Sequence, residues 1–256
     1  MKVIILAGGR GTRLAEETEV TPKPMVEIGG RPMLWHVMSC YSRYAINEFF
    51  VALGYKGEVI KRYFLDYHKL SRNLRVDLAT GAVDAGESEC EDWKVNLIDT
   101  GMDTNTGGRV KRMEQFVSGE TFMLTYGDGV SDVNLDKLLK FHRSHGRIAT
   151  VTAVRPQARF GSLALDGDVV TGFAEKSQLG EGWINGGFIV FEASVFRYLG
   201  GDNSSLETDT LKELAQAGQL VAYRHDGFWQ CMDTIRDKAL LQKLWQDGEA
   251  PWKVQG

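Results

Sequence analysis

The sequence predicts an α/β fold, in which a mixed, mainly parallel sheet is covered by helices on both faces. From residue 2 to residue 154, apolar runs alternate with stretches of helical periodicity, as expected for strands joined by helical crossovers. The pattern then changes to a β-hairpin with a tight glycine turn over 162–173, which we expect to extend the fold. With 256 residues, 43% of them hydrophobic, the chain can bury one large core. We therefore expect a single domain over 1–256.

Each element follows from the local period of the apolar residues. Apolar or alternating runs predict strands at 2–7, 49–53, 74–79, 94–99, 121–126, 148–154, 187–191 and 219–224. Apolar residues at helical spacing predict helices at 32–41, 58–67, 109–117, 134–145, 193–199, 206–217 and 234–246. Residues 80–92 are small and acidic, which predicts a surface loop or irregular insertion.

The composition argues against several classes of protein. The net charge of −4 disfavours a generic nucleic-acid binder, which usually carries a basic surplus. Three scattered cysteines, Cys40, Cys90 and Cys231, form no C-x-x-C pair, so they indicate reduced thiols rather than zinc or disulfides. We expect no signal peptide and no membrane span, because the apolar run after Met1 soon ends in glycines and no run of about 18 apolar residues exists. These features predict a cytoplasmic protein.

A glycine-rich loop, Gly8–Arg13, follows the first strand. Glycines let backbone N–H groups turn toward a polyphosphate, and Arg10, Arg13 and Lys23 add positive charge nearby. The loop is neither a dinucleotide fingerprint, whose third glycine is Leu14 here, nor a P-loop. An ordinary tight turn is the alternative. We interpret the loop as a triphosphate site.

Polar residues follow other predicted strands as well. In a Rossmann-like sheet, ligands collect at the carboxyl ends of the strands, so 100–109 and 127–129 should share one crevice with the glycine loop. Asp128 and Asp233 could hold one Mg²⁺, which favours one or two carboxylates plus phosphate oxygens. Asp128 could instead cap a turn, and Asp233 could cap the helix that follows it.

Two further groups suit a sugar phosphate. Glu175 accepts hydrogen bonds, Lys176 neutralises phosphate, and Asn185 both donates to and accepts from a polyol. Alone, each is also a common surface feature. His142 and His145 lie three residues apart, but with no further His or Cys nearby we interpret them as solvated or packed.

The run from Leu6 to Leu14, with Pro22-Lys23-Pro24 downstream, closely resembles the signature of the sugar-1-phosphate nucleotidylyltransferases. Within that superfamily, the likeness to the glucose-1-phosphate cytidylyltransferase family covers nearly the whole chain. It is carried by the runs 22–30, 34–36, 54–57, 99–101, 106–109, 125–130, 184–188, 227–230, 232–234 and 250–253. One departure is Ser177, where relatives often have proline after the Glu-Lys pair.

The resemblance implies that CTP and glucose 1-phosphate give CDP-glucose and pyrophosphate, for deoxysugar supply to surface polysaccharides such as O-antigen. It implies Mg²⁺ on Asp128 and Asp233, Arg13 and Lys23 as catalytic residues, and a homohexamer with no nucleic-acid or membrane partner. Nucleotide would be held in 1–130 and sugar phosphate in 131–233, with 234–256 as a C-terminal helix and tail. The implied substrate-binding residues are Leu6, Ala7, Gly8, Gly9, Gly11, Thr12, Arg13, Lys23, Thr100, Gly101, Thr106, Arg109, Tyr126, Gly127, Asp128, Glu175, Lys176, Asn185 and Gly186.

Two other functions stay open at this point. The same chemistry with another base would make the chain a thymidylyl-, uridylyl- or guanylyltransferase, because strand-end motifs do not determine the base. A nucleotide-sugar sensing subunit could keep the fold without turnover. Intact Arg13, Lys23, Asp128, Lys176 and Asp233 argue against that second function.

Overall fold

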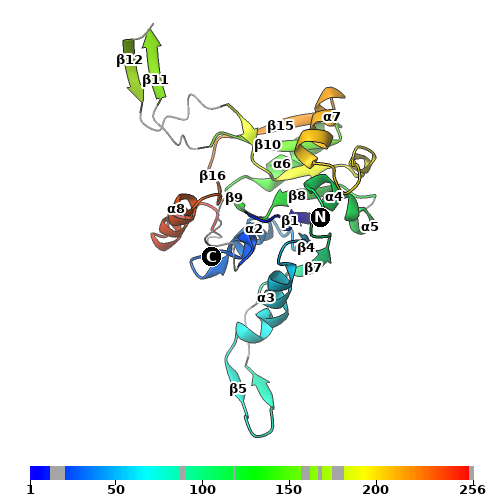
Figure 1. Ribbon diagram of the computed structural model, residues 1–256, viewed down its shortest axis with the longest axis vertical. Helices are drawn as coiled ribbons and strands as arrows, with labels where there is room; N and C mark the ends of the chain where they lie inside the picture. The colour runs from blue at the N-terminus through cyan, green and yellow to red at the C-terminus, as the bar shows by residue number, and fades with distance from the viewer. Residues whose placement is uncertain are drawn as a thin grey trace.

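A mixed eight-stranded sheet forms the centre of the computed structural model, which describes residues 1–11, 21–86, 90–117, 119–156, 162–166, 169–174 and 182–253 (Figure 1). The strands are β1 (Lys2–Leu6), β4 (Glu48–Leu53), β7 (Lys94–Asp99), β8 (Phe122–Tyr126), β10 (Ala149–Val154), β13 (Ile184–Asn185), β14 (Ile189–Phe191) and β15 (Leu220–His225). Their order is β13-β10-β14-β8-β1-β4-β7, with β15 paired to β10. The ladders among β8, β1, β4 and β7 are parallel, as is β10–β15, whereas β14 runs antiparallel to β8 and β10. The predicted mixed, mainly parallel sheet is confirmed.

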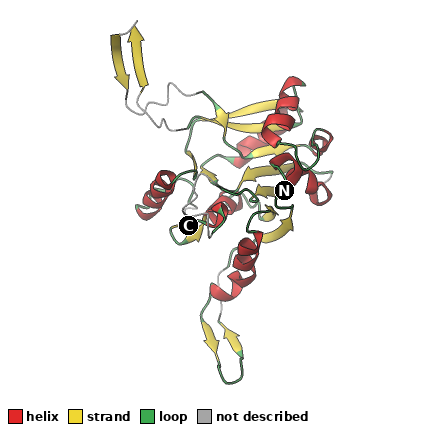
Figure 2. Ribbon diagram, viewed as in Figure 1, coloured by secondary structure: helices red, strands yellow, loops and turns green. Residues whose placement is uncertain are grey.

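Helices flank the sheet (Figure 2). They are α2 (Met33–Ser42), α3 (Gly57–Leu70), α4 (Thr106–Arg112), α5 (Glu114–Val117), α6 (Leu135–His145), α7 (Leu211–Gln216) and α8 (Ile235–Gln246). The described structure also contains two 3₁₀ turns, η2 (Lys23–Met25) and η4 (Ala193–Arg197), and one π-turn, η5 (Leu206–Thr210).

Both faces of the sheet are buried, because successive side chains of a strand point to opposite faces. Val3 and Ile5 of β1 join one core cluster with residues of α2 and α6. Ile4 and Leu6 join a second cluster with residues of α4 and α7. The expectation of helices on both faces is therefore confirmed.

Four two-stranded ribbons complete the described structure. They are β2 (Glu27–Ile28) with β3 (Arg31–Pro32), β5 (Leu74–Val76) with β6 (Val83–Ala85), β9 (Gly129–Ser131) with β16 (Trp229–Cys231), and β11 (Ser162–Asp166) with β12 (Val169–Ala174). The β11–β12 pair confirms the predicted hairpin over 162–173. No helix in the described part of the chain is long and apolar enough to cross a bilayer.

The prediction for residues 74–92 was wrong in part. The expected strand ends at Val76, and a second strand, β6, pairs with it inside the stretch that we interpreted as a loop. A turn at Asp77 joins the two strands, because its side-chain Oδ1 accepts from the backbone N–H groups of Ala79 and Thr80. Strands of three residues are too short to show a period, so only the turn chemistry could have indicated this hairpin.

The helix predicted at 109–117 begins earlier and is interrupted. Asn105 caps α4 by accepting from the backbone N–H of Thr106, and the helix ends before Met113, after which α5 begins. Two glycines near the start of α4 allow close packing. A Cβ on Gly107 would lie 2.7 Å from Ser204 Oγ, and one on Gly108 would lie 2.6 Å from Asp202 Cα.

The other helix predictions of the second half also needed correction. The segment predicted as a helix at 193–199 is the 3₁₀ turn η4, and the one predicted at 206–217 consists of the π-turn η5 and then α7. The periodicity of the apolar residues indicated a helical backbone, but not which hydrogen-bond spacing it would adopt.

His36, a residue of α2, is fully buried against the C-terminal segment. Its Nε2 lies 2.8 Å from the carbonyl oxygen of Ile28, and Trp252 Nε1 donates to its Nδ1 at 3.3 Å. A neutral imidazole satisfies both contacts, with Nε2 protonated and Nδ1 accepting. Burial lowers the pKa of His36 from 6.5 to about 4.

Acidification should therefore destabilise the protein through His36. Unfolded His36 binds a proton below pH 6.5, whereas folded His36 does not until about pH 4, so stability is lost as pH falls through this window. Between pH 7 and pH 5 this group should lower the unfolding free energy by about 2 kcal/mol. Urea unfolding of His36→Gln at both pH values should therefore show a smaller fall in unfolding free energy from pH 7 to pH 5 than wild type shows. His68→Gln, at an exposed histidine of α3, is the control and should keep the wild-type drop. An equal drop in His36→Gln and wild type would contradict the assignment.

Candidate active site

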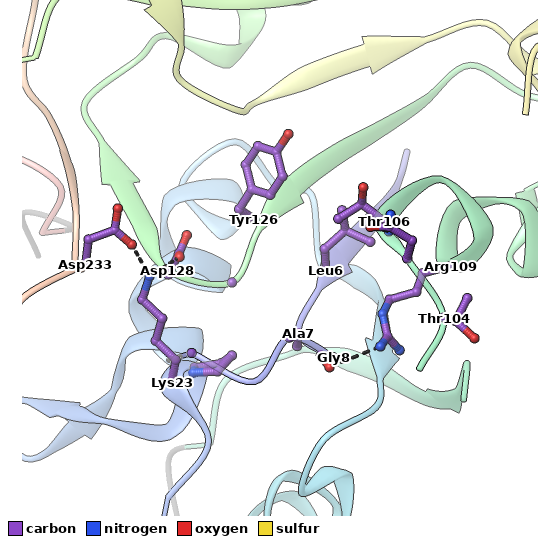
Figure 3. A pocket seen from close by; sticks show the side chains of 15 residues that line it. Leu6, Ala7, Gly8, Lys23, Thr104, Thr106, Arg109, Tyr126, Asp128 and Asp233 are labelled. Carbon is purple, nitrogen blue, oxygen red and sulfur yellow. Dashed lines mark hydrogen bonds and ion pairs between the residues drawn. The ribbon is translucent and has the colours of Figure 1, made fainter. Parts of the chain in front are cut away.

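A cavity of about 370 Å³ opens where β1 and β8 end (Figure 3). The described residues that line it come from the glycine loop, η2, the start of α4, the end of β8 and the segment after β16. They are Leu6, Ala7, Gly8, Gly9, Gly11, Lys23, Pro24, Thr104, Asn105, Thr106, Arg109, Tyr126, Gly127, Asp128 and Asp233. The structure thus brings the glycine loop, residues 104–109 and residues 126–128 together at one crevice, as the strand ends predicted.

Arg109 holds the glycine loop from behind. The residue is only 4% exposed, and its guanidinium donates to the carbonyl oxygen of Gly8 at 3.1 Å. It also donates to three more carbonyl oxygens and to one hydroxyl, those of Leu53, Gly101, Met102 and Thr100. Burial lowers the pKa of Arg109 from its ordinary value. The guanidinium thus makes five hydrogen bonds to other groups of the protein.

The contact with Arg109 explains why the loop needs glycine at position 8. A Cβ on Gly8 would lie 2.4 Å from Arg109 Cζ, too close for any side chain unless the guanidinium moved. The carbonyl oxygen of Gly8 also accepts from the backbone N–H of Tyr55 at 3.1 Å, which ties the loop to the end of β4. The first part of the loop is therefore positioned from the protein side.

Lys23 lies between two carboxylates at the other end of the cavity (Figure 3). Its ammonium Nζ is 2.5 Å from Asp128 Oδ2 and also bonds Asp233 Oδ1. Burial by itself would lower the pKa of Lys23, but the charges and hydrogen bonds of Asp128 and Asp233 outweigh it and hold the pKa above its ordinary value. Lys23 is therefore positively charged at neutral pH.

The two aspartates meet because two short strands pair. Gly129 in β9 lies opposite Cys231 in β16, and the backbone N–H of Met232 donates to the carbonyl oxygen of Asp128 at 2.8 Å. Asp128 precedes β9 and Asp233 follows β16, so an antiparallel ladder brings them to the same end. Their proximity is a consequence of this pairing and not of sequence spacing.

Thr234, and not Asp233, caps the last helix. The hydroxyl of Thr234 accepts from the backbone N–H of Asp237, whose carboxylate returns the bond to the backbone N–H of Thr234. The alternative in which Asp233 serves as the helix cap is therefore wrong. The carboxylate of Asp233 points instead toward Lys23 and the cavity (Figure 3).

The donor set at Lys23 suits a divalent cation. Asp128 and Asp233 already share one positive charge, the Lys23 ammonium, so their oxygens converge on a single cationic position. Magnesium needs few protein carboxylates when phosphate oxygens complete its shell. Among the described residues, no group of three or more His, Cys, Asp or Glu side chains gathers into a metal site.

Several predicted site residues lie away from the cavity wall. Thr100 is fully buried, with its hydroxyl 2.6 Å from the carbonyl oxygen of Leu53, and neither it nor Gly101 lines the cavity. Asn185 and Gly186 also lie outside the lining, although Asn185 bonds the lining residue Tyr126. The predictions for Thr12, Arg13, Glu175 and Lys176 lie outside the described residues.

Sequence reasoning missed two kinds of residue here. Asn105 lines the cavity and caps α4, and an asparagine before a helical segment is a signal that could have found it. Glu207 bonds two cavity residues, Thr106 and Tyr126, from 101 and 81 positions further along the chain, and no local signal marks it. His142, by contrast, is packed as expected, with Nδ1 2.8 Å from Thr150 Oγ1.

Comparison with known proteins places the chain among nucleotidyl transferases. The family model described as "Nucleotidyl transferase" matches residues 2–247. The glucose-1-phosphate cytidylyltransferase of Salmonella typhi is 47% identical over 255 residues, which cover 99% of each chain. A probable glucose-1-phosphate cytidylyltransferase of Bacillus subtilis is 44% identical over 99% of this chain and 100% of its own length.

Solved structures share the fold at lower identity. HddC from Yersinia pseudotuberculosis superposes with a TM-score of 0.70 at 24% identity, covering 95% of this chain and 99% of its own. A putative glucose-1-phosphate thymidylyltransferase from Bacillus anthracis gives the same TM-score at 19% identity, covering 100% of this chain and 97% of its own. These structures support the architecture of the sheet and its helices.

Proposed function

Because the chain belongs to the nucleotidyl transferase family, we propose that it transfers CMP from CTP to glucose 1-phosphate, giving CDP-glucose and pyrophosphate. The observation that carries this proposal is the 47% identity with the Salmonella typhi cytidylyltransferase over 99% of both chains. The cavity is consistent with it, because a glycine loop, a partly buried lysine and two carboxylates border one space. This set of groups suits the phosphates of a nucleotide and a cation.

The reaction is a direct displacement. A phosphate oxygen of glucose 1-phosphate attacks the α-phosphorus of CTP, a new P–O bond forms, and pyrophosphate leaves from the opposite side with the electrons of the broken bond. The second pKa of a phosphate monoester is about 6, so at neutral pH the nucleophile is already ionised and no general base is required. The barrier then consists mainly of repulsion between anions and of alignment.

The residues of the cavity can lower both contributions to the barrier, the repulsion between anions and the cost of alignment. Lys23 provides a positive charge beside the phosphates, and the backbone from Gly8 to Gly11 provides N–H groups. Asp128 and Asp233 would hold Mg²⁺, which when bound neutralises charge on the phosphate oxygens. The catalytic role of Arg13 and the sugar-phosphate roles of Glu175 and Lys176 stay predictions.

A panel of triphosphates tests the function. Pyrophosphate release with glucose 1-phosphate should be high with CTP and low with dTTP, UTP, ATP and GTP. A preference for another triphosphate would keep the chemistry and replace the base. If folded protein released no pyrophosphate with any of the five triphosphates, the result would favour a nucleotide-sugar sensing subunit. The cytoplasmic location and the supply of polysaccharide precursors stay predictions of the resemblance.

We further propose that the protein associates with copies of itself. Six large hydrophobic side chains between residues 65 and 83 are exposed: Leu65, Leu70, Leu74, Val76, Leu78 and Val83. They lie on α3 and the β5–β6 hairpin, which extend away from the sheet (Figure 1). Such a concentration of apolar surface is typical of an interface. Light scattering after size exclusion should give the mass of a homohexamer, and Leu78→Glu should lower it.

A further inference from the structure

A chain of hydrogen bonds runs along one side of the cavity through Glu207. One carboxylate oxygen of Glu207 accepts from Thr106 Oγ1 at 2.7 Å, and the other accepts from the hydroxyl of Tyr126 at 2.7 Å. Asn185 Nδ2 then donates to the Tyr126 oxygen at 3.2 Å. Thr106 and Tyr126 both line the cavity, whereas Asn185 lies beyond Tyr126.

We infer that Glu207 is a positioning residue for the sugar half of the substrate, acting through Tyr126 on the amide of Asn185. This inference rests on the proposed function and names a residue that the sequence did not reveal. It predicts that Glu207 affects the binding of the sugar phosphate much more than the binding of the triphosphate.

The direction of each hydrogen bond follows from the chemistry of the groups. A carboxylate only accepts, so the single proton of the Tyr126 hydroxyl goes to Glu207. The Tyr126 oxygen can then only accept from Asn185, which must present its NH₂ group rather than its carbonyl oxygen. Burial, together with the charge and hydrogen bond of Glu207, raises the pKa of Tyr126, so the hydroxyl keeps its proton at neutral pH.

The other end of the Asn185 amide is also determined. Its Oδ1 accepts from the backbone N–H of Gly187 at 3.0 Å, which agrees with the orientation that Tyr126 demands. After these two contacts the amide keeps a second N–H and a second lone pair on its exposed side. Because the amide orientation is determined, the positions of this N–H and this lone pair are determined too. The hydroxyl groups of a polyol, which both donate and accept, would recognise them.

Local structure holds Glu207 in place. It lies in the π-turn η5, and wide turns of this kind are frequent at functional sites. Ser205 Oγ donates to Glu207 at 3.0 Å, and the backbone N–H of Leu206 donates to Thr106 Oγ1 at 2.9 Å. The absence of a side chain on Gly107 lets this segment approach α4.

The test compares the binding of two ligands that share cytidine. In calorimetric titrations, Glu207→Gln should bind CDP-glucose on the order of 10-fold more weakly than wild type, because only one of the two terminal atoms of glutamine can accept, so the hydroxyl contacts on the other side must reverse or break. Its affinity for CTP should change less than about 3-fold on the same scale. The control is Asp209→Asn, which removes the same charge from the same turn but whose carboxylate contacts Ser205 and Thr208 instead of the cavity. It should bind both ligands as wild type does.

A second variant separates positioning from simple packing. Tyr126→Phe should weaken CDP-glucose binding to a similar extent, and combining it with Glu207→Gln should add little, because both act on the same amide. Additive losses, equal losses for both ligands, or unchanged CDP-glucose binding by Glu207→Gln would overturn the inference alone. Wild-type protein that binds neither ligand would overturn the proposed function and the inference together.

Discussion

Asp233→Asn should lower turnover of CTP and glucose 1-phosphate by on the order of 10²–10³-fold, the loss expected when one preorganised electrostatic contact to the transition state is removed. Asp233 borders the cavity and points toward the same cationic position as Asp128. The substitution is nearly isosteric, and Lys23 keeps Asp128 as its partner, so no charge is left buried alone. We therefore expect a folded protein with a chemical defect.

The measurement is pyrophosphate release as a function of Mg²⁺ concentration, for Asp233→Asn, Asp128→Asn and a control. Asp136→Asn is suitable as the control, because this exposed aspartate lies in the first turn of α6 and does not line the cavity. Metal binding can be followed separately with Mn²⁺ as a paramagnetic probe, and should weaken in both cavity variants. If both variants kept near-wild-type, Mg²⁺-dependent turnover, the metal assignment would be wrong.

Arg109→Met should lower the unfolding free energy by about 3 kcal/mol, because five hydrogen bonds, most of them to buried groups, are lost together. The carbonyls of Gly8 and Leu53 keep a backbone partner each, which limits the loss. The glycine loop would also lose its support, so the affinity for CTP should fall by at least about 10-fold. Urea unfolding and calorimetric titration measure the two effects.

Arg112→Met is the matched control, because Arg112 lies one turn further along the same helix in an exposed pair with Asp202. It should leave the urea midpoint nearly unchanged, since exposed ion pairs contribute little. Loss of CTP affinity without loss of stability in Arg109→Met would contradict the structural role of Arg109. It would show that Arg109 contacts the nucleotide directly, as the sequence alone suggested, and that its contacts to the backbone matter less.

The chain itself determined the elements that position the site. The alternation of apolar runs and helical periods was enough to predict β1, β4, β7, β8 and the helices α2 and α3, because those signals depend only on neighbouring residues. The glycines after β1 and the polar residues after β8 predicted a crevice at the strand ends, since parallel strands end at the same edge. Signals failed where elements were too short to show a period, as at β6.

Only the tertiary structure decided which distant groups meet. Asp128 and Asp233 are brought together by the β9–β16 ladder, and Lys23 lies between them. Arg109 lines the cavity, as expected of a residue near the nucleotide, but it also holds the glycine loop, because carbonyl oxygens of three separate segments converge on its guanidinium. Glu207 reaches the cavity through the packing of η5 on α4. Such contacts depend on how the whole core packs, and no local pattern in the sequence records that packing.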